Sequence, residues 1–439
     1  MKMPTLQAIV AAGLAAAVGF GGLFVTHAHA SDEQYLPSFV YRTGPYASSG
    51  IGIADGFADY ITMINERDGG INGVRIRLEE CETAYSNNRG VVCYEERIDR
   101  YGGATVIAPF STGITYALIR RSRNDNIVLT TMGYGRSDAA YGPVIDNVFP
   151  APITHMSSMT IMLRHIADQE GGWENLDGKD IVHAYHDSAY GREPLPVLHH
   201  YAEEYGFTLH EMAIGLDQRA VWNRIRRIDP DWVTLLTWGV MTPTALRTAA
   251  SVGVDMERII GGHYVSQDEA VEPVDQAAVG YRAANFHGAG SDYPVYEDMQ
   301  RYVLDQGLEA GDGDQFGNIA YSRGMVNAAY IVEAWRQAQA EFEEGRPSTR
   351  AETLWAWQQL TITESRAEEM GMLGLLPEVE ITCENHEGEG RALIQQWDGE
   401  NWVELTDFMA ADMDVVFPIY KESAQRYAQE EGITPRVCD

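Results

Sequence analysis

The sequence predicts an α/β protein built on two parallel sheets, each wound with helices on both faces. Short apolar runs alternate with amphipathic helical patterns, which is typical of strand–helix units in a parallel sheet. The alternation restarts near residue 152. The chain also has 439 residues, a length that exceeds one ordinary core and suits two α/β lobes.

The first unit begins with a predicted strand over residues 35–41 and a turn at Thr43-Gly44-Pro45. A helix over 52–67 follows, because its apolar residues recur on one face. We expect further strands at 74–79, 105–109 and 127–131, alternating with helices at 90–101 and 115–124.

The second unit opens with a predicted helix over 153–169. Strands are expected at 180–185, 207–212, 232–237 and from 259, with helices at 190–205, 220–228 and 243–252 between them. After Gly280 the pattern is helical, over 293–306, 319–343 and 350–360. Strands at 379–382 and 391–396, with a tight turn over 397–402, predict a closing β-hairpin or meander.

The first thirty residues have the pattern of an export signal. Lys2 precedes an apolar run over 8–25, and Ala28-His29-Ala30 places small residues at the cleavage site. Cleavage after Ala30 is favoured over an uncleaved membrane anchor because glycines interrupt the run. No later stretch is apolar enough to span a membrane, so we expect a secreted mature chain that is not embedded in a membrane.

The chain is strongly acidic, with 64 acidic and 32 basic residues and a net charge of −32. Such a charge argues against nucleic acid or anionic lipid as the partner. The acidic residues are spread along the chain, which favours a solvated surface suited to a saline habitat over an acidic binding function.

The four cysteines are expected to form disulfides in an oxidising compartment. Proximity in the sequence favours Cys81–Cys93 and Cys383–Cys438, although four cysteines allow three pairings. Zinc binding is the rival interpretation, but the sequence has no Cys-x-x-Cys pair. We predict no metal and no cofactor, and no nucleophile-elbow or zinc-protease motif is present.

Short motifs occur in a fixed order behind the export signal. They are Arg42-Thr43-Gly44-Pro45, Asp68-Gly69-Gly70-Ile71-Asn72-Gly73, Ala108-Pro109-Phe110-Ser111-Thr112, Asp187-Ser188-Ala189-Tyr190-Gly191-Arg192 and Gln396-Trp397-Asp398-Gly399. With them, the chain from about residue 35 to 408 resembles the periplasmic solute-binding proteins of the branched-chain amino acid (Leu/Ile/Val-binding) type, which serve ABC importers.

The resemblance implies a type I periplasmic-binding-protein fold with two lobes joined by three crossovers. Lobe 1 would comprise residues 31–151 and 280–375, lobe 2 with the hinge hairpin 152–279 and 376–410, and a C-terminal helical tail 411–439. A small-molecule ligand would bind in the cleft, and closure would present a surface to the ABC permease subunits in the periplasm. This is a binding function without catalysis; the alternatives are a secreted α/β hydrolase-like enzyme and a ligand-sensing receptor module.

Ligands of open α/β sheets bind at the carboxyl ends of the strands, so the segments that follow the strands are the candidate site. Phe110, Ser111 and Thr112 precede a helix, where hydroxyls and free N–H groups suit a carboxylate. Simple N-capping of that helix is the alternative. The resemblance implies the carboxylate role, and implies a hydroxyl and a backbone carbonyl from the next strand end, Thr131, Met132, Gly133 and Tyr134.

The second unit offers Tyr190, Trp238, His263 and Tyr264 as cleft residues. The resemblance implies an aromatic ring over the ligand at Tyr190, whereas Trp238 fits a core role equally well. It also places His263 where family members that bind α-amino acids often carry an acid, and Asp268 stands several residues away. The aromatic character of the expected lining suits a flat or bulkier ligand, or a cation held over rings. Amino acids, amides and aromatic carboxylates all remain candidate ligands.

Overall fold

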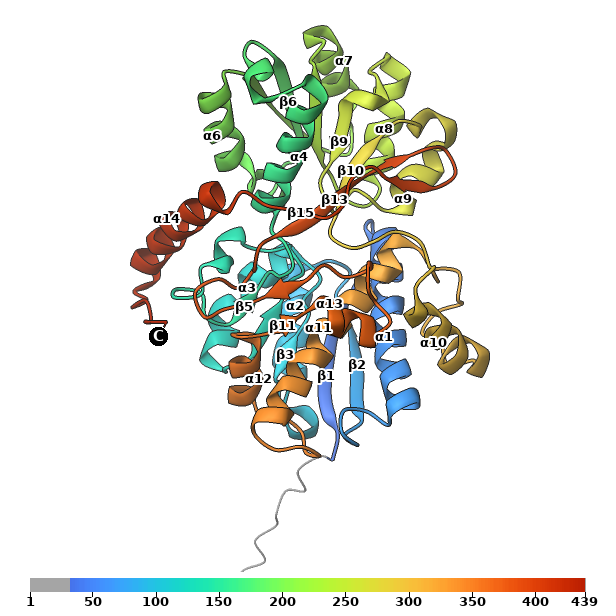
Figure 1. The fold of residues 1–439 in the computed structure, drawn as a ribbon, viewed down its shortest axis with the longest axis vertical. Helices are drawn as coiled ribbons and strands as arrows, with labels where there is room; N and C mark the ends of the chain where they lie inside the picture. Colours follow the sequence, from blue (N-terminus) through green and yellow to red (C-terminus); the bar gives the residue numbers. More distant parts are fainter. Residues whose placement is uncertain (1–31, 439) are drawn as a thin grey trace, which may run out of the picture. The chain divides into compact units, whose positions relative to one another are not determined.

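Parallel strands form two separate groups along the chain, and Figure 1 shows helices packed around each. The computed structural model describes residues 32–438, which pack as one compact unit. The predicted signal peptide lies outside the described residues. We use "lobe 1" for the part of the structure that carries β1–β5 and "lobe 2" for the part that carries β6–β10.

Strands β1–β5 of lobe 1 pair only in parallel. β1 (Gln34–Val40) pairs with β2 (Ile76–Glu82), and β4 (Val128–Thr130) lies between β3 (Val106–Ile107) and β5 (Val148–Phe149). A bridge between Ser38 and Ala108 links the two pairings. All seven residues of β1 are buried, as expected when helices cover both faces of a parallel sheet. The helices α2 (Asn87–Arg97) and α3 (Thr112–Asn124) connect these strands.

Two long helices pack closely beside this sheet, α1 (Ala47–Asp68) and α11 (Ile319–Glu341). Glycines form their contact. A Cβ atom at Gly56 would lie 2.0 Å from the carbonyl oxygen of Tyr321, and one at Gly324 would lie 2.0 Å from that of Ile53. The backbones therefore touch, and most of α11 is buried around its whole circumference.

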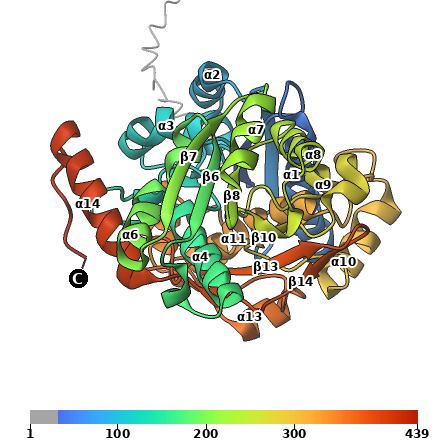
Figure 2. The same ribbon diagram turned by 90° about the horizontal axis from the view of Figure 1, so that it is seen from above.

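The lobe 2 sheet has the strand order β14-β13-β10-β9-β8-β6-β7. Its parallel strands are β6 (Asp180–His186), β7 (Thr208–Ile214), β8 (Trp232–Leu236), β9 (Ile259–Gly261) and β10 (Arg282–Asn285). Figure 2 shows α4 (His155–Glu170) and α6 (Leu195–Tyr205) on one side of the sheet, and α7 (Arg219–Ile228) and α8 (Met241–Val252) on the other. This doubly wound arrangement agrees with the predicted fold class.

The chain crosses between the lobes three times: from β5 to α4, from β10 to α10 (Pro294–Tyr302), and from β12 (Val379–Glu380) to β13 (Arg391–Trp397). β13 runs antiparallel to β10 and forms a hairpin with β14 (Trp402–Glu404), as the tight turn over 397–402 predicted. The other short elements are α5 (Ala189–Arg192), α9 (Asp268–Val271), α12 (Arg350–Trp357), α13 (Glu364–Glu369), β11 (Thr361–Ile362) and β15 (Met409–Ala410).

Two element predictions were wrong. The chain is not helical directly after Gly280, because β10 follows and joins the lobe 2 sheet between β9 and β13. Its sequence, Arg-Ala-Ala-Asn, lacks the branched apolar run that marks a strand. The strand predicted at 379–382 forms no hairpin with β13; β12 instead pairs with β11.

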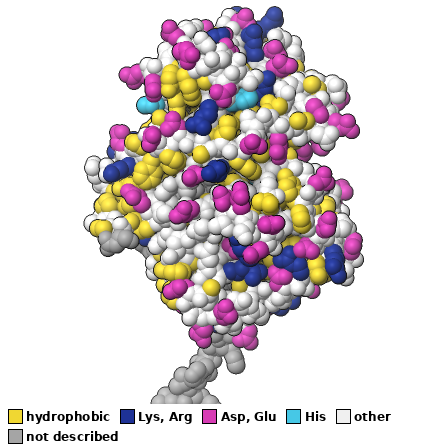
Figure 3. Space-filling view, viewed as in Figure 1, with side chains coloured by type: hydrophobic (Ala, Val, Ile, Leu, Met, Phe, Trp, Pro, Cys, Tyr) yellow, Lys and Arg dark blue, Asp and Glu magenta, His cyan; other side chains and the backbone are white. Residues whose placement is uncertain are grey.

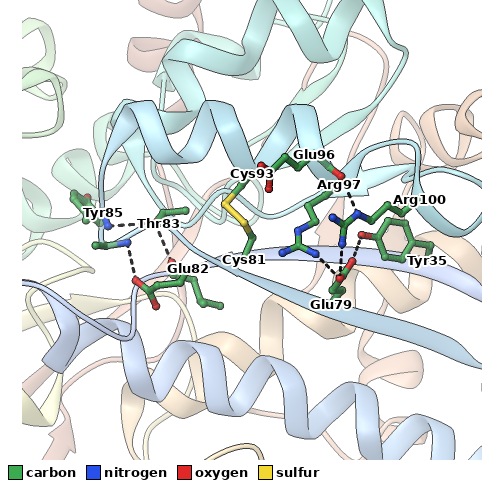
Figure 4. The surroundings of a disulfide bond; sticks show 12 residues. Tyr35, Glu79, Cys81, Glu82, Thr83, Tyr85, Cys93, Glu96, Arg97 and Arg100 are labelled. Atoms are coloured by element: carbon green, nitrogen blue, oxygen red, sulfur yellow. Dashed lines mark hydrogen bonds and ion pairs between the residues drawn. A yellow bond between two sulfur atoms is a disulfide. The ribbon is translucent and has the colours of Figure 1, made fainter.

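The two disulfides have the pairing expected from proximity. Cys81–Cys93 joins β2 to α2, and Figure 4 shows Glu79 beside it, accepting hydrogen bonds from Arg97, Arg100 and the Tyr35 hydroxyl. Cys383–Cys438 spans 55 residues and ties the segment after α14 (Met413–Glu431), the predicted helical tail, back to the chain that follows β12.

The face of the molecule in Figure 3 carries acidic side chains scattered between basic and apolar ones, in agreement with a dispersed negative charge. Within residues 32–438, no helix combines the length and apolar character that crossing a membrane requires.

Candidate functional site

Seven aromatic side chains line a small pocket at the carboxyl ends of strands from both lobes. The lining residues are Tyr41, Ile53, Tyr85, Phe110, Ser111, Thr112, Tyr134, Tyr190, Trp238 and Tyr264. We call this cavity the aromatic pocket. A pocket lined by rings with a few hydroxyls has the character of a small-molecule site.

Lobe 1 contributes the segment between β3 and α3. The Ser111 hydroxyl accepts the N–H of Ile114 at 3.4 Å, so this residue caps the helix, as the alternative interpretation predicted. Phe110 has a left-handed backbone, with φ of 46°. Its N–H donates to the hydroxyl of Tyr134 at 2.5 Å, and this bond holds an unfavourable conformation beside the pocket.

Lobe 2 contributes three aromatic residues that follow its strands. The Tyr190 hydroxyl, from α5, donates to the carbonyl of Thr237 at 3.0 Å. Trp238 follows β8, and its buried indole N–H has no hydrogen-bond partner among residues 32–438. The Tyr264 hydroxyl donates to the carbonyl of Met132 at 2.8 Å, which connects lobe 2 to lobe 1 beside the pocket.

Seven of the eleven predicted ligand residues line the aromatic pocket, and four do not: Thr131, Met132, Gly133 and His263 lie behind its wall. His263 stacks on His155 with ring centres 4.6 Å apart. Burial lowers the pKa of His263 well below its ordinary value, so the ring is neutral. Asp268, the possible substitute acid, accepts the N–H of Ile319 at 2.8 Å instead of lining the pocket.

Three lining residues were missed by sequence reasoning: Tyr41, Ile53 and Tyr85. Tyr41 directly follows β1, so the strand-end rule that selected Phe110 could have found it. Ile53 was assigned to the apolar face of a helix, and Tyr85 stands in a loop after β2, where no local pattern indicates a ligand contact.

A larger neighbouring cavity of about 300 Å³ shares five lining residues with the aromatic pocket. It adds polar groups from Asn87, His186 and Ser188. None of the side chains that line either cavity is acidic.

The residues 32–438 hold no group of three or more His, Cys, Asp or Glu side chains placed to bind a metal ion. His183, one of two histidines on β6, instead makes hydrogen-bond contacts with Thr234 and the Gly191 carbonyl.

The doubly wound lobes and the pocket at their strand ends are those of a two-lobed solute-binding protein. The chain matches the profile of the periplasmic binding protein family over residues 34–401, and it belongs to that family. A search of curated proteins found no match.

Solved structures agree with this fold. A protein of the Pseudomonas fluorescens group described as an ABC transporter permease is 41% identical, with a TM-score of 0.88 over 93% of this chain and 100% of that chain. A branched-chain amino acid ABC transporter protein from Thermus thermophilus with bound valine is 22% identical, with a TM-score of 0.74 over 88% and 99%. A solute-binding protein from R. palustris in complex with benzoate is 14% identical, with a TM-score of 0.65 over 87% and 98%.

Proposed function

We propose that this protein is the periplasmic substrate-binding subunit of an ABC importer, and that it captures a small aromatic or apolar organic acid between its lobes. The observation that carries the proposal is the aromatic pocket, to which strand ends of both lobes contribute. Its rings and hydroxyls suit binding and not turnover. Family membership supports the same class of function.

The composition of the pocket narrows the ligand class. Aromatic walls favour a planar or apolar body, and the start of α3 offers N–H groups and the Thr112 hydroxyl to a carboxylate. An α-amino acid also carries an ammonium group that requires an acceptor, and no acidic side chain lines the pocket. The similar fold of the R. palustris protein with bound benzoate supports an aromatic acid as the first ligand to test.

Closure of the lobes would couple binding to transport. The hydrogen bond between Tyr264 and the Met132 carbonyl spans the lobes beside the pocket, so it can form only when they are together. We propose that the ligand stabilises this closed arrangement and that the permease subunits recognise it.

A thermal-shift and calorimetry screen tests the proposal with benzoate, 4-hydroxybenzoate, octanoate, valine and acetamide. We expect the aromatic acids to raise the melting temperature most, since a ligand at about 100 times its Kd adds about 2.7 kcal/mol of stability. Failure of the whole panel to bind would refute the ligand class.

A matched pair of variants locates the site. Trp238→Ala removes a buried lining ring and should weaken binding at least about tenfold, because a buried aromatic side chain contributes well over 1.4 kcal/mol. Phe342→Ala removes a ring that is 47% exposed and does not line the pocket, so it should leave affinity unchanged. Equal effects of the two substitutions would contradict the assignment of the pocket.

A further inference from the structure

Arg323, on α11, is fully buried without a counter-ion. Its side chain is 0% exposed. One terminal nitrogen, Nη2, donates to the carbonyl of His263 at 2.8 Å, Ser266 Oγ at 3.2 Å and Asn285 Oδ1 at 3.2 Å. Within the described part of the chain, Nε and Nη1 have no hydrogen-bond partner. None of the ion pairs formed among residues 32–438 includes this guanidinium.

The guanidinium lies directly behind the aromatic pocket. Its carbon is 4.8 Å from the ring centre of Tyr264, a lining residue, and 5.1 Å from that of Phe286. The positive charge also acts on two other lining residues, Tyr41 and Tyr190. It lowers the pKa of both hydroxyls, although the larger effect of burial raises it. Arg323 is thus electrostatically coupled to rings on several sides of the pocket.

The neighbouring titratable groups do not neutralise this charge directly. Burial lowers the pKa of His155 and His287 to about 3, so both rings are neutral. The carboxylate of Glu269 is inaccessible and unpaired, and burial raises its pKa to about 8, which keeps it protonated at pH 7. Burial raises the pKa of Asp268 to about 6, and its ionised carboxylate is bound by the N-terminus of α11, about one helical turn from Arg323.

We propose that Arg323 makes the aromatic pocket selective for a ligand that carries a negative charge and no positive charge. The inference rests on the proposed function and deepens it. An uncompensated charge in a buried site is costly, and an anionic ligand supplies the missing counter-charge. A cationic ligand is disfavoured, because the guanidinium carbon lies only 4.8 Å from the Tyr264 ring centre and its charge repels a second positive charge in the pocket.

In the unmodified protein, the effect of Arg323 is measured by comparing the affinities of ligands that differ in charge. Benzoate, benzamide and benzylammonium present similar aromatic bodies with charges of −1, 0 and +1. Two unit charges about 10 Å apart at an effective dielectric constant of about 20 change an affinity about tenfold or more. We therefore expect benzoate to bind at least about tenfold more tightly than benzamide, and benzylammonium to bind most weakly.

Variants then test whether Arg323 causes the preference for benzoate over benzamide. Arg323→Met should reduce the ratio of benzoate to benzamide affinity to below about threefold, while Arg323→Lys should keep most of it because the charge remains. Arg336→Met is the matched control. Arg336 lies on the same helix but is ion-paired with Asp68 and Glu333, so its loss should leave the ratio unchanged. Circular dichroism establishes that each variant is folded.

The outcomes separate this inference from the proposed function. Benzamide binding as tightly as benzoate in the unmodified protein would overturn the charge role of Arg323 and leave an aromatic-binding subunit standing. The comparison of benzoate with benzamide tests the charge role of Arg323 even if Arg323→Met does not fold. Tighter binding of benzylammonium would show a cation site and overturn the inference. No binding of any of the three compounds would overturn the proposed ligand class, and the inference with it.

Discussion

Replacing Gly324 with alanine should destabilise the protein, because this glycine lets α1 and α11 touch. The added Cβ would lie 2.0 Å from the carbonyl oxygen of Ile53 and 2.7 Å from the backbone nitrogen of Phe57. Ordinary contact requires about 3.4 Å, so the helices must separate by more than an ångström, and the neighbouring atoms are backbone that cannot rotate away.

The size of the destabilisation by Gly324→Ala follows from two opposing contributions to the free energy of unfolding. Overpacking of a dense core costs about 1–3 kcal/mol or more, and alanine regains about 1 kcal/mol over glycine inside a helix. Because the clash involves fixed backbone, we expect a cost at the upper end of this range, so Gly324→Ala should lower the free energy of unfolding by about 2 kcal/mol. Urea unfolding followed by circular dichroism and tryptophan fluorescence measures it.

Gly215 provides the matched control for this substitution. It follows β7, its backbone is not left-handed, and a Cβ atom there would meet nothing within 4 Å. Gly215→Ala should be neutral or stabilising by up to about 1 kcal/mol, since it restricts the unfolded chain. If Gly324→Ala proves as stable as Gly215→Ala, the helices are not held in contact as described and the reasoning fails.

Three further predictions concern other parts of the protein. Tyr264→Phe leaves the Met132 carbonyl without its donor and should cost about 1–2 kcal/mol in urea unfolding; an unchanged midpoint would mean that the bond between the lobes is not formed in solution. The raised pKa of Glu269, about 8, means that stability is present at low pH and lost as pH rises from its ordinary value of 4.5 through 8. Glu269→Gln should therefore be stabilising by about 4 kcal/mol at pH 9 and nearly neutral at pH 5; equal gains at both pH values would contradict the buried acid. Replacing Cys383 and Cys438 with serine opens a loop of 55 residues and should cost about 4 kcal/mol in chemical unfolding, whereas an unaffected double variant would show that the tail contributes no constraint.

Much of the fold could be predicted because its signals are local. β6 and β8 are largely buried runs, rich in apolar residues, between helical patterns, and both were found within about two residues of their ends. β10 could not be found this way, since its small residues become a strand only when β9 and β13 flank them. The pairing of β12 with β11 depends on where the chain returns to lobe 1, and no local sequence pattern encodes that position.

In the candidate site, too, residues with a local sequence signal were predicted, and those that depend on distant packing were not. The strand-end rule selected Tyr264 and His263 together, but only Tyr264 lines the pocket, and the His263 ring is stacked on His155 instead. Arg323 was not selected as a site residue, because its relation to the pocket exists only once α11 has packed against residues far away in the sequence. An arginine one turn into a largely apolar helix was the available signal.

The three crossings of the chain between its lobes have a consequence for the order in which the protein is assembled. All ten strands of β1–β10 have been synthesised by Asn285, yet α11, which packs on lobe 1, and β13, which extends the sheet of lobe 2, come later. A chain that stops at a crossover would expose an apolar sheet face in one lobe and an open strand edge in the other. Neither lobe is complete at Asn285, so the cleft between them is complete only when the last third of the polypeptide has arrived.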